Sequence, residues 1–321
     1  MPNLSPKLRK LNREYANLTI LLVVLMFLSL AVGCSSRRSV SVTTPANKNI
    51  HSQGIYPIAV TDDRGKSISI KSESRRIVSI SPSNTEILYA LGLGDRIVGV
   101  TNFCDYPPEA KEKPKIGDMN VSVEKVLSLQ PDLILAHGKL NDGIIRQLEG
   151  LNLTVVALDP ESIIGVKRDI LLVGRVCGQE SVAKQLDSRI AKAIEQVTLR
   201  NKGKAGARTL VAIQANPLWV AGPKTLVGEM LSICNAENIA ADARPGFNTF
   251  PIERALARDP QVIVVGRESE RKFLIKSPVW KNTTAVRSDR VVVINPDLLV
   301  RPGPRLVEGL QLLEKAVHRV D

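Results

Sequence analysis

Residues 123–138 read VEKVLSLQPDLILAHG, and residues 252–266 follow the same plan as IERALARDPQVIVVG. In each copy an apolar residue precedes a glutamate and a cation, a proline follows seven residues after the glutamate, and an apolar run leads to glycine. A residue before proline is driven out of the α region, so each copy predicts a short helix that ends before its proline. The apolar run predicts a strand of a parallel sheet covered on both faces.

The two copies lie about 130 residues apart, which is far longer than the period of a solenoid repeat. The repeat therefore predicts two similar α/β lobes. Chance is the alternative, because a helix, a proline and a strand are a common succession in α/β proteins. Glu124 and Glu253 argue against chance, since neither has a role in a core and yet they recur in register.

Composition excludes several classes of protein. The 321 residues suffice for two domains with cores, and 44% apolar and 24% charged residues are typical of a soluble globular protein. The net charge of +12 would suit a nucleic acid, but the basic residues are dispersed and no nucleic-acid motif is present. We expect a solvated basic surface and no nucleic-acid partner. The three histidines are far apart, and no zinc-ligand spacing occurs, so no metal site is expected.

The N-terminus resembles a bacterial lipoprotein signal. Basic residues precede an apolar run of 15 residues (18–32), which is too short for a transmembrane helix of about 20 residues. Residues 1–33 are expected to be the signal peptide, and the resemblance implies cleavage before Cys34 and lipid attachment to its thiol. An uncleaved anchor is the alternative and would leave the protein at the same membrane. Residues 34–55 read as a flexible tether in which His51 is solvated.

The rest of the chain divides into three parts. Residues 56–160 predict an N-terminal α/β lobe, residues 161–201 carry helical periodicity, and residues 202–321 predict a C-terminal α/β lobe. Gly178 is expected to split the helical part in two. The second helix, from about 179 to 199, would be roughly 30 Å long and would form a stiff spine between the lobes.

Five of the few aromatic residues fall in segments read as loops at one edge of the two lobes: Phe103, Tyr106, Trp219, Phe247 and Phe250. A chain poor in aromatics normally keeps them for its core, so this placement indicates an apolar-walled cleft for a large or flat ligand. The alternative is that they pack beneath the loops.

Charged residues supply further candidates. Asp297 and Arg301 lie in a proline-rich stretch read as a loop, where they would pair with each other or bind polar groups of a ligand. Helical pairing between them is not expected beside Pro302. Glu124 and Glu253 would either stabilise the N-termini of their helices or form two acidic contacts for a basic partner with two-fold symmetry.

Several motifs occur in order along the chain: residues 60–65 (VTDDRG), 76–86 (RIVSISPSNTE), 90–92 (ALG), 105–108 (DYPP) and the two repeat copies. From residue 56 to the end, they resemble the substrate-binding proteins of ABC importers for cobalamin, iron-siderophores and haem. The resemblance implies the class III fold, with two Rossmann-like lobes joined by one long rigid helix and little hinge closure. It also implies delivery to an ABC permease dimer with ATPase subunits, whose arginines Glu124 and Glu253 would meet.

Within this family the cobalamin-binding branch is the nearest in pattern. Residues 105–108, Trp219, Asp297 and Arg301 are similar to corrinoid-contacting positions of that branch. His137 is a departure, because the branch can carry tryptophan there, and it would be an axial ligand to a metal centre or a hydrogen-bonding residue. The predicted ligand-binding residues are Phe103, Tyr106, His137, Trp219, Phe247, Asp297 and Arg301. A ferric siderophore or haem is the alternative ligand on the same scaffold.

Two other classes fit poorly. An envelope enzyme would need a nucleophile elbow or paired carboxylates in one loop, and the chain has neither, so no catalytic residue is expected. A zinc or manganese receptor would need several histidines. We expect a monomer in the cell envelope, with a lipid anchor and no cofactor beyond its ligand. Cys104, Cys177 and Cys234 remain after lipidation, an odd number that leaves at least one thiol unpaired or paired between chains.

Overall fold

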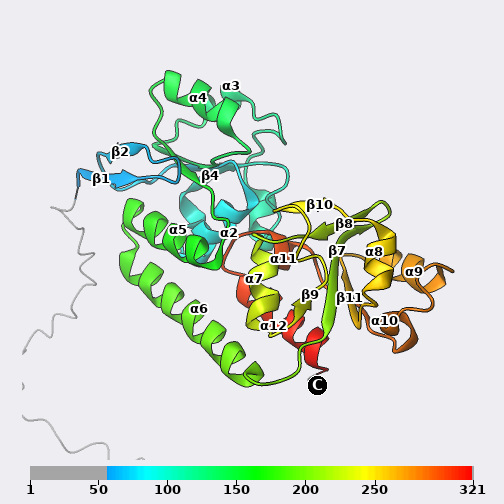
Figure 1. Cartoon of the computed structure of the whole chain (residues 1–321). Coiled ribbons are helices and arrows are strands. Elements are labelled where there is room, and N and C mark those ends of the chain that lie inside the picture. The colour runs from blue at the N-terminus through cyan, green and yellow to red at the C-terminus, as the bar shows by residue number, and fades with distance from the viewer. Residues whose placement is uncertain (1–55, 320–321) are drawn as a thin grey trace, which may run out of the picture. The chain divides into compact units, whose positions relative to one another are not determined.

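Both copies of the repeated stretch form a short helix and a buried strand in the computed structural model, which describes residues 56–319 (Figure 1). The first copy contains α3 (Val123–Ser128) and β5 (Leu133–His137), and the second contains α8 (Ile252–Ala257) and β11 (Val262–Val265). The residue before each proline has a positive φ, 44° at Gln130 and 40° at Asp259, so the chain leaves both helices through the left-handed region. The predicted repeat is confirmed.

The N-terminal lobe is built on a four-stranded parallel sheet. Apolar side chains on one face pack against α3 and α4, and those on the other face pack against α2 and α5. A β-hairpin of β1 (Ile58–Thr61) and β2 (Ser67–Ile70) precedes this sheet. The strands in spatial order are β4 (Ile97–Val100), β3 (Ile77–Ser79), β5 and β6 (Val155–Leu158), with helices α2 (Pro82–Ala90) and α4 (Asp142–Gly150) and 3-10 turns η1 (Gly94–Arg96) and η2 (Pro108–Glu112).

The C-terminal lobe repeats this plan on a mixed sheet. Its parallel strands β7 and β11 have the same places as β3 and β5, while β8 and β10 add an antiparallel edge. The strands are β7 (Arg208–Ala215), β8 (Leu218–Ala221), β9 (Glu237–Asn238), β10 (Phe247–Thr249), β11 and β12 (Val291–Val293); the helices are α7 (Leu226–Ile233), α8, α9 (Glu268–Lys276), α10 (Thr284–Arg287), α11 (Asp297–Val300) and α12 (Leu306–His318).

Two packed helices carry the chain from one sheet to the other (Figure 1). They are α5 (Ile163–Val176) and α6 (Glu180–Asn201), and Gly178 separates them with a φ of 70°. Buried residues of α6, such as Leu186 and Ile190, join a core cluster that also holds strand residues of both lobes. The predicted pair of α/β lobes joined by one long helix is therefore confirmed.

Several segments differ from the sequence-based expectation. Trp219 lies on β8 and Phe247 on β10, so both stand on paired strands and not in loops. Asp297 begins the short helix α11, and Arg301 is its C-terminal cap. Local pattern missed these elements because β10 has three residues and α11 has four, too few for a period.

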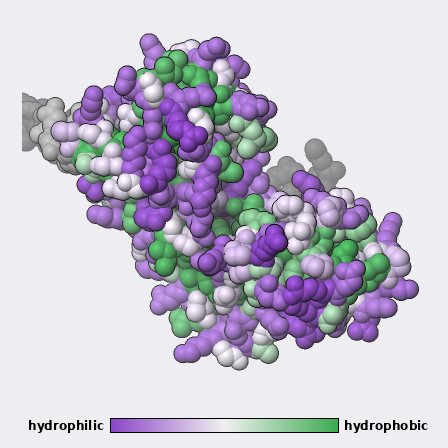
Figure 2. All heavy atoms as spheres, turned by 45° about the horizontal axis from the view of Figure 1, so that its top comes forward, coloured by the Kyte–Doolittle hydropathy of each residue, from purple (hydrophilic) through white to green (hydrophobic). Residues whose placement is uncertain are grey.

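The remaining observations concern the N-terminal segments, membrane-spanning helices, the cysteines and the surface. The predicted signal (1–33), the lipidation site Cys34 and the tether (34–55) with His51 lie outside the described residues. Between residues 56 and 319 no helix is both long and apolar enough to cross a membrane. Cys104, Cys177 and Cys234 are all buried and unpaired. On the face shown in Figure 2, hydrophilic side chains predominate and hydrophobic ones occur in small groups.

Candidate functional site

A cavity of about 440 Å³ lies between the two lobes at the carboxyl ends of β5 and β6. This is the edge of a parallel sheet at which ligands bind in open α/β folds. His137 and Asp159 line it from the N-terminal lobe, and Phe247 and Val300 line it from the C-terminal lobe. Of the predicted ligand-binding residues, His137 and Phe247 therefore share one cavity.

The other predicted aromatic residues have two different environments. Phe103, Tyr106 and Trp219 expose between 40% and 49% of their surface, which is high for large apolar side chains. Phe250 is only 5% exposed and packs in the core of the C-terminal lobe, with the guanidinium of Arg254 over its ring. The expectation that Phe250 lines the cleft is wrong.

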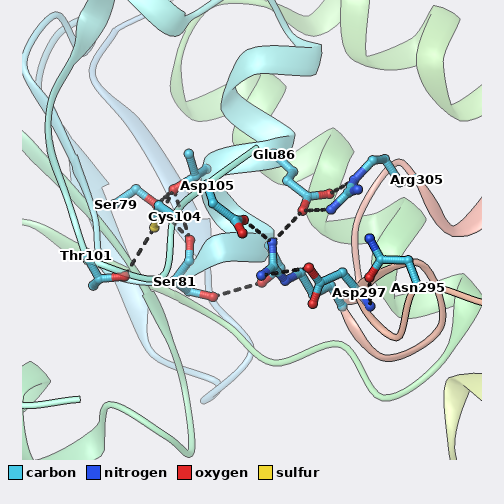
Figure 3. A network of polar contacts seen from close by, with 12 residues as sticks. Ser79, Ser81, Glu86, Thr101, Cys104, Asp105, Asn295, Asp297 and Arg305 are labelled. Atoms are coloured by element: carbon cyan, nitrogen blue, oxygen red, sulfur yellow. Dashed lines mark hydrogen bonds and ion pairs between the residues drawn. The ribbon is translucent and has the colours of Figure 1, made fainter. Parts of the chain in front are cut away.

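Arg301 is held by carboxylates from both lobes, and Figure 3 labels these carboxylates, Glu86, Asp105 and Asp297. Its guanidinium lies 2.7 Å from Asp105 Oδ1, 3.0 Å from Asp297 Oδ2 and 3.3 Å from Glu86 Oε1. The contact with Asp297 has helical i,i+4 spacing, because α11 extends to Val300. The expectation that helical pairing would not occur there is wrong.

Arg305 completes this polar cluster. It donates two hydrogen bonds to the Glu86 carboxylate, at 2.5 and 2.8 Å, and its guanidinium carbon lies 3.8 Å from the centre of the Tyr106 ring. We call Glu86, Asp105, Asp297, Arg301 and Arg305 the interlobe cluster. Three carboxylates and two guanidiniums give it a net charge of −1 when all five are ionised.

Ionisation in the cluster follows from these contacts. Partial burial raises the pKa of Asp105, but the hydrogen bond and the charge of Arg301 outweigh burial, so this pKa lies below its ordinary value. Burial works against the charge of Arg301, and the three carboxylates still raise its pKa. Asp105 and Arg301 are both charged at neutral pH, and the cluster is a network of ion pairs.

His137 faces the cavity with a carboxylate behind it. Its Nδ1 lies 3.3 Å from Asp159 Oδ1, without the alignment of a directed hydrogen bond. Burial lowers the pKa of His137, and the opposing attraction of Asp159 does not restore it, so the imidazole is neutral at neutral pH. A neutral imidazole can accept a hydrogen bond or bind a metal centre through a ring nitrogen.

The wall behind His137 contains a second group of carboxyls. The backbone N–H of Asp159 donates to Asp63 Oδ2 at 2.7 Å, and Asp63 pairs with Arg168 at 2.6 Å. Asp169, beside them on α5, is fully buried. Burial and then the charge of Asp63 raise the pKa of Asp169 to about 8. Asp169 is therefore mostly protonated at neutral pH.

Glu124 and Glu253 are both exposed and occupy the second position of their helices, α3 and α8. An arginine at the start of the central strand of each lobe fixes the C-terminus of the helix. Arg76 donates to the carbonyls of Leu129 and Gln130, and Arg208 donates to those of Arg258 and Asp259. The repeat thus extends to an arginine clamp that sequence reasoning missed, although each arginine stands at the N-terminal end of a strand, Arg76 before Ile77 and Arg208 before Thr209.

The clamp is matched by a second hydrogen bond in each lobe. Asp132 accepts from the backbone N–H of Arg76 at 3.1 Å, and Gln261 accepts from that of Arg208 at 2.9 Å. Both acceptors directly follow the repeat proline. The two lobes are therefore equivalent at the level of single side chains, and the two glutamates occupy equivalent positions.

The two-lobed chain matches a known protein family. The family model for periplasmic binding proteins matches residues 77–298. The chain belongs to the periplasmic binding protein family. The fold is that of class III members, whose two lobes are joined by a long helix. As a family member the chain is a substrate-binding protein of an ABC transporter and not an enzyme. That role implies a small-molecule ligand, a permease with its ATPase, and a location outside the cytoplasm.

Three members of the family illustrate the likeness. An uncharacterised ABC transporter substrate-binding lipoprotein of Bacillus subtilis, YvrC, is 36% identical over 272 residues, covering 82% of this chain and 86% of that protein. A vitamin B12-binding protein of Yersinia pseudotuberculosis is 32% identical over 243 residues, covering 75% and 85%. The solved periplasmic haem-binding protein RhuT of Roseiflexus sp. RS-1 is 28% identical, covers 76% and 97%, and has a TM-score of 0.67.

Proposed function

We propose that the protein is a lipoprotein that captures a corrinoid, cobalamin, between its lobes and delivers it to an ABC permease. In this proposal residues 1–33 are the signal peptide, Cys34 carries the lipid, and residues 34–55 are the tether to the membrane. Residues 56–160 and 202–321 form the two ligand-binding lobes, and residues 161–201 join them. The protein acts as a monomer.

The observation that carries the choice of ligand is the pairing of the two arginines of the interlobe cluster. Arg301 and Arg305 are already neutralised by carboxylates of the protein, so they attract a carboxylate-bearing ligand weakly. The Arg301 contacts use Oδ1 of Asp105 and Oδ2 of Asp297, which leaves the second oxygen of each carboxylate as a further acceptor. The corrin ring carries amide side chains whose N–H groups are the donors that such acceptors require.

The apolar part of the corrinoid has suitable partners as well. The exposed rings of Phe103, Tyr106, Trp219 and Phe247 would contact the flat macrocycle, because aromatic rings bind large apolar faces. His137 would face the metal side of the ligand as a hydrogen-bonding residue or an axial ligand. Phe247 and His137 line the same cavity, and this supports their assignment to one ligand.

Haem is the second candidate. One observation favours it: His137 presents a neutral imidazole to the cavity, and neutral imidazole binds haem iron. The haem-binding relative of similar fold is consistent with that candidate. Haem carries two propionates, however, which would approach Asp105 and Asp297 and be repelled.

A titration separates the candidates. The full-length protein in detergent would be titrated with cyanocobalamin, haem and a ferric hydroxamate, following each visible spectrum and each change in tryptophan fluorescence. The proposal predicts saturable binding of cyanocobalamin at micromolar concentration or below, and weaker binding of haem. Absence of cyanocobalamin binding in that range refutes the choice of cobalamin.

We also propose that Glu124 and Glu253 dock the protein onto basic residues of the two permease subunits. Their exposure and their equivalent positions on α3 and α8 support this role. Replacing both by arginine should leave ligand affinity unchanged and abolish transport into proteoliposomes that contain the permease. Glu195→Arg, an exposed charge reversal on α6, is the control and should transport normally. Transport by the double variant at the rate of the control would contradict the docking role.

A further inference from the structure

Glu86 joins the two arginines of the interlobe cluster (Figure 3). It lies on α2 of the N-terminal lobe, and only 2% of its side chain is exposed. A buried carboxylate is costly unless it is paired and hydrogen-bonded. Its partners Arg301 and Arg305 follow 215 and 219 residues later in the chain, in the C-terminal lobe. The burial of Glu86 thus depends on contact between the lobes.

Both arginines lead from Glu86 to the predicted ligand-binding residues. Arg305 donates two hydrogen bonds to the Glu86 carboxylate, and its guanidinium also covers one face of the Tyr106 ring. Tyr106 is still 42% exposed, so part of the ring remains open. Arg301 reaches Asp105 and Asp297, whose side chains are 49% and 30% exposed and so leave acceptors open to solvent. Glu86 itself contributes almost no surface.

The chain between the two arginines also lies against α2. A Cβ added to Gly303 would lie 3.5 Å from Glu86 Oε2 and 3.8 Å from the carbonyl oxygen of Ser83. This segment therefore lies close to the first turns of α2 at Gly303, and the ion pairs of Glu86 join it to that helix. The position of Glu86 and the position of the segment are coupled.

We propose that Glu86 is a positioning residue for the ligand cleft. From the N-terminal lobe it holds Arg305 against Tyr106 and keeps Arg301 between Asp105 and Asp297. Removing its charge leaves two adjacent guanidiniums with one carboxylate fewer, so they repel each other and the Tyr106 ring loses its support. The cleft is thereby ordered before the ligand arrives, and this lowers the entropic cost of binding. The effect on cobalamin affinity rests on the proposed function, whereas the effect on the free protein does not.

The chain offers a matched control for Glu86→Gln. Glu314 on α12 is also a buried carboxylate that accepts two hydrogen bonds from one arginine, at 3.0 and 2.7 Å from Arg200. Its partners lie on α6 and not in the cleft. Glu314→Gln therefore removes the same chemistry from the fold while leaving the cleft intact. A purely structural role for Glu86 predicts that the two variants behave alike.

The first test is hydrogen–deuterium exchange of the ligand-free, full-length protein in detergent. Glu86→Gln should raise exchange both in residues 102–108 and in residues 297–306, and Glu314→Gln should raise it in neither segment. Unchanged exchange in either segment of Glu86→Gln overturns the proposal. This measurement involves no ligand, so it decides the role of Glu86 even when cyanocobalamin does not bind the wild type.

The second test is the affinity for cyanocobalamin. Glu86→Gln should weaken binding by about tenfold or more, the effect of losing one charge-assisted hydrogen bond, and Glu314→Gln should not. Equal affinities for the two variants overturn the proposal. If Glu86→Gln fails to fold, Arg305→Lys takes its place. This variant keeps the buried carboxylate paired but loses the planar contact with Tyr106. Arg305→Lys should raise exchange in residues 102–108, and unchanged exchange there overturns the proposal.

Discussion

Asp169→Asn should stabilise the protein more as the pH rises. Asp169 on α5 is fully buried beside Asp63 and Arg168, and its Oδ1 accepts from the Arg168 guanidinium at 3.3 Å. Its Oδ2 is buried without a hydrogen-bond acceptor or donor in the structure. The pKa of about 8, raised first by burial and then by the charge of Asp63, means that the native protein retains a proton here.

The sign and size of the effect follow from this retained proton. The unfolded chain releases it near the ordinary pKa of 3.8, so between pH 4 and 8 the native state binds one more proton than the unfolded state. Native stability therefore decreases as the pH rises through this range, by about 1.4 kcal/mol per unit for this group. Asparagine does not titrate, and its amide N–H can donate to Asp63. Its advantage over the wild type should grow by about 3 kcal/mol between pH 5 and 7.

Urea denaturation at pH 5, 6 and 7 measures this difference in the free energy of unfolding. Asp169→Ala is the matched control: it also lacks the titrating group but leaves a space, so its stability should follow the pH dependence of Asp169→Asn with a constant deficit. Parallel stability curves for the wild type and Asp169→Asn would refute the assignment of a protonated carboxyl at this position.

Two further predictions concern the parts that position the site. Arg208→Ala should lower the free energy of unfolding by about 1–2 kcal/mol in urea denaturation, and the more exposed Arg76→Ala by less, because each removes hydrogen bonds to the end of a repeat helix. If neither variant has a lower free energy of unfolding, the arginine clamp is contradicted. Gly309→Ala would place a Cβ 2.1 Å from the carbonyl oxygen of Leu298, so it should displace α11, cost about 1–3 kcal/mol and weaken ligand binding in the titration. A Cβ added at Gly143 meets open space, so Gly143→Ala should change neither stability nor ligand binding. Equal behaviour of the two glycine variants would exclude the close packing of Gly309 against Leu298.

Much of the fold could be predicted because it is encoded locally. The two repeat copies carry a proline, an apolar run and a glycine in fixed order, and these dictate where a helix ends and a buried strand begins. The α6 helix was predictable for the same reason, since its apolar stripe has helical period over many turns.

The site was less predictable because its contacts are remote in sequence. Glu86 and Arg305 are separated by 219 residues, and nothing near either one indicates the other. Phe250 was misplaced because scarcity of aromatics does not decide between cleft and core. Its burial depends on the packing of α8 and β8, which only the assembled sheet determines.

The proposed choice of ligand requires that the cleft offer carboxylate acceptors and neutralised arginines to a flat ligand with amide donors. It is tested most directly by comparing two corrinoids that share the ring: cobinamide, whose side chains are amides, and cobyrinic acid, in which carboxylates replace them. Equilibrium dialysis of the full-length protein against each should show cobinamide bound about tenfold more tightly or better, since Asp105 and Asp297 repel carboxylates. Equal binding of the two, or preference for cobyrinic acid, would show that the cleft does not select amide donors over carboxylates.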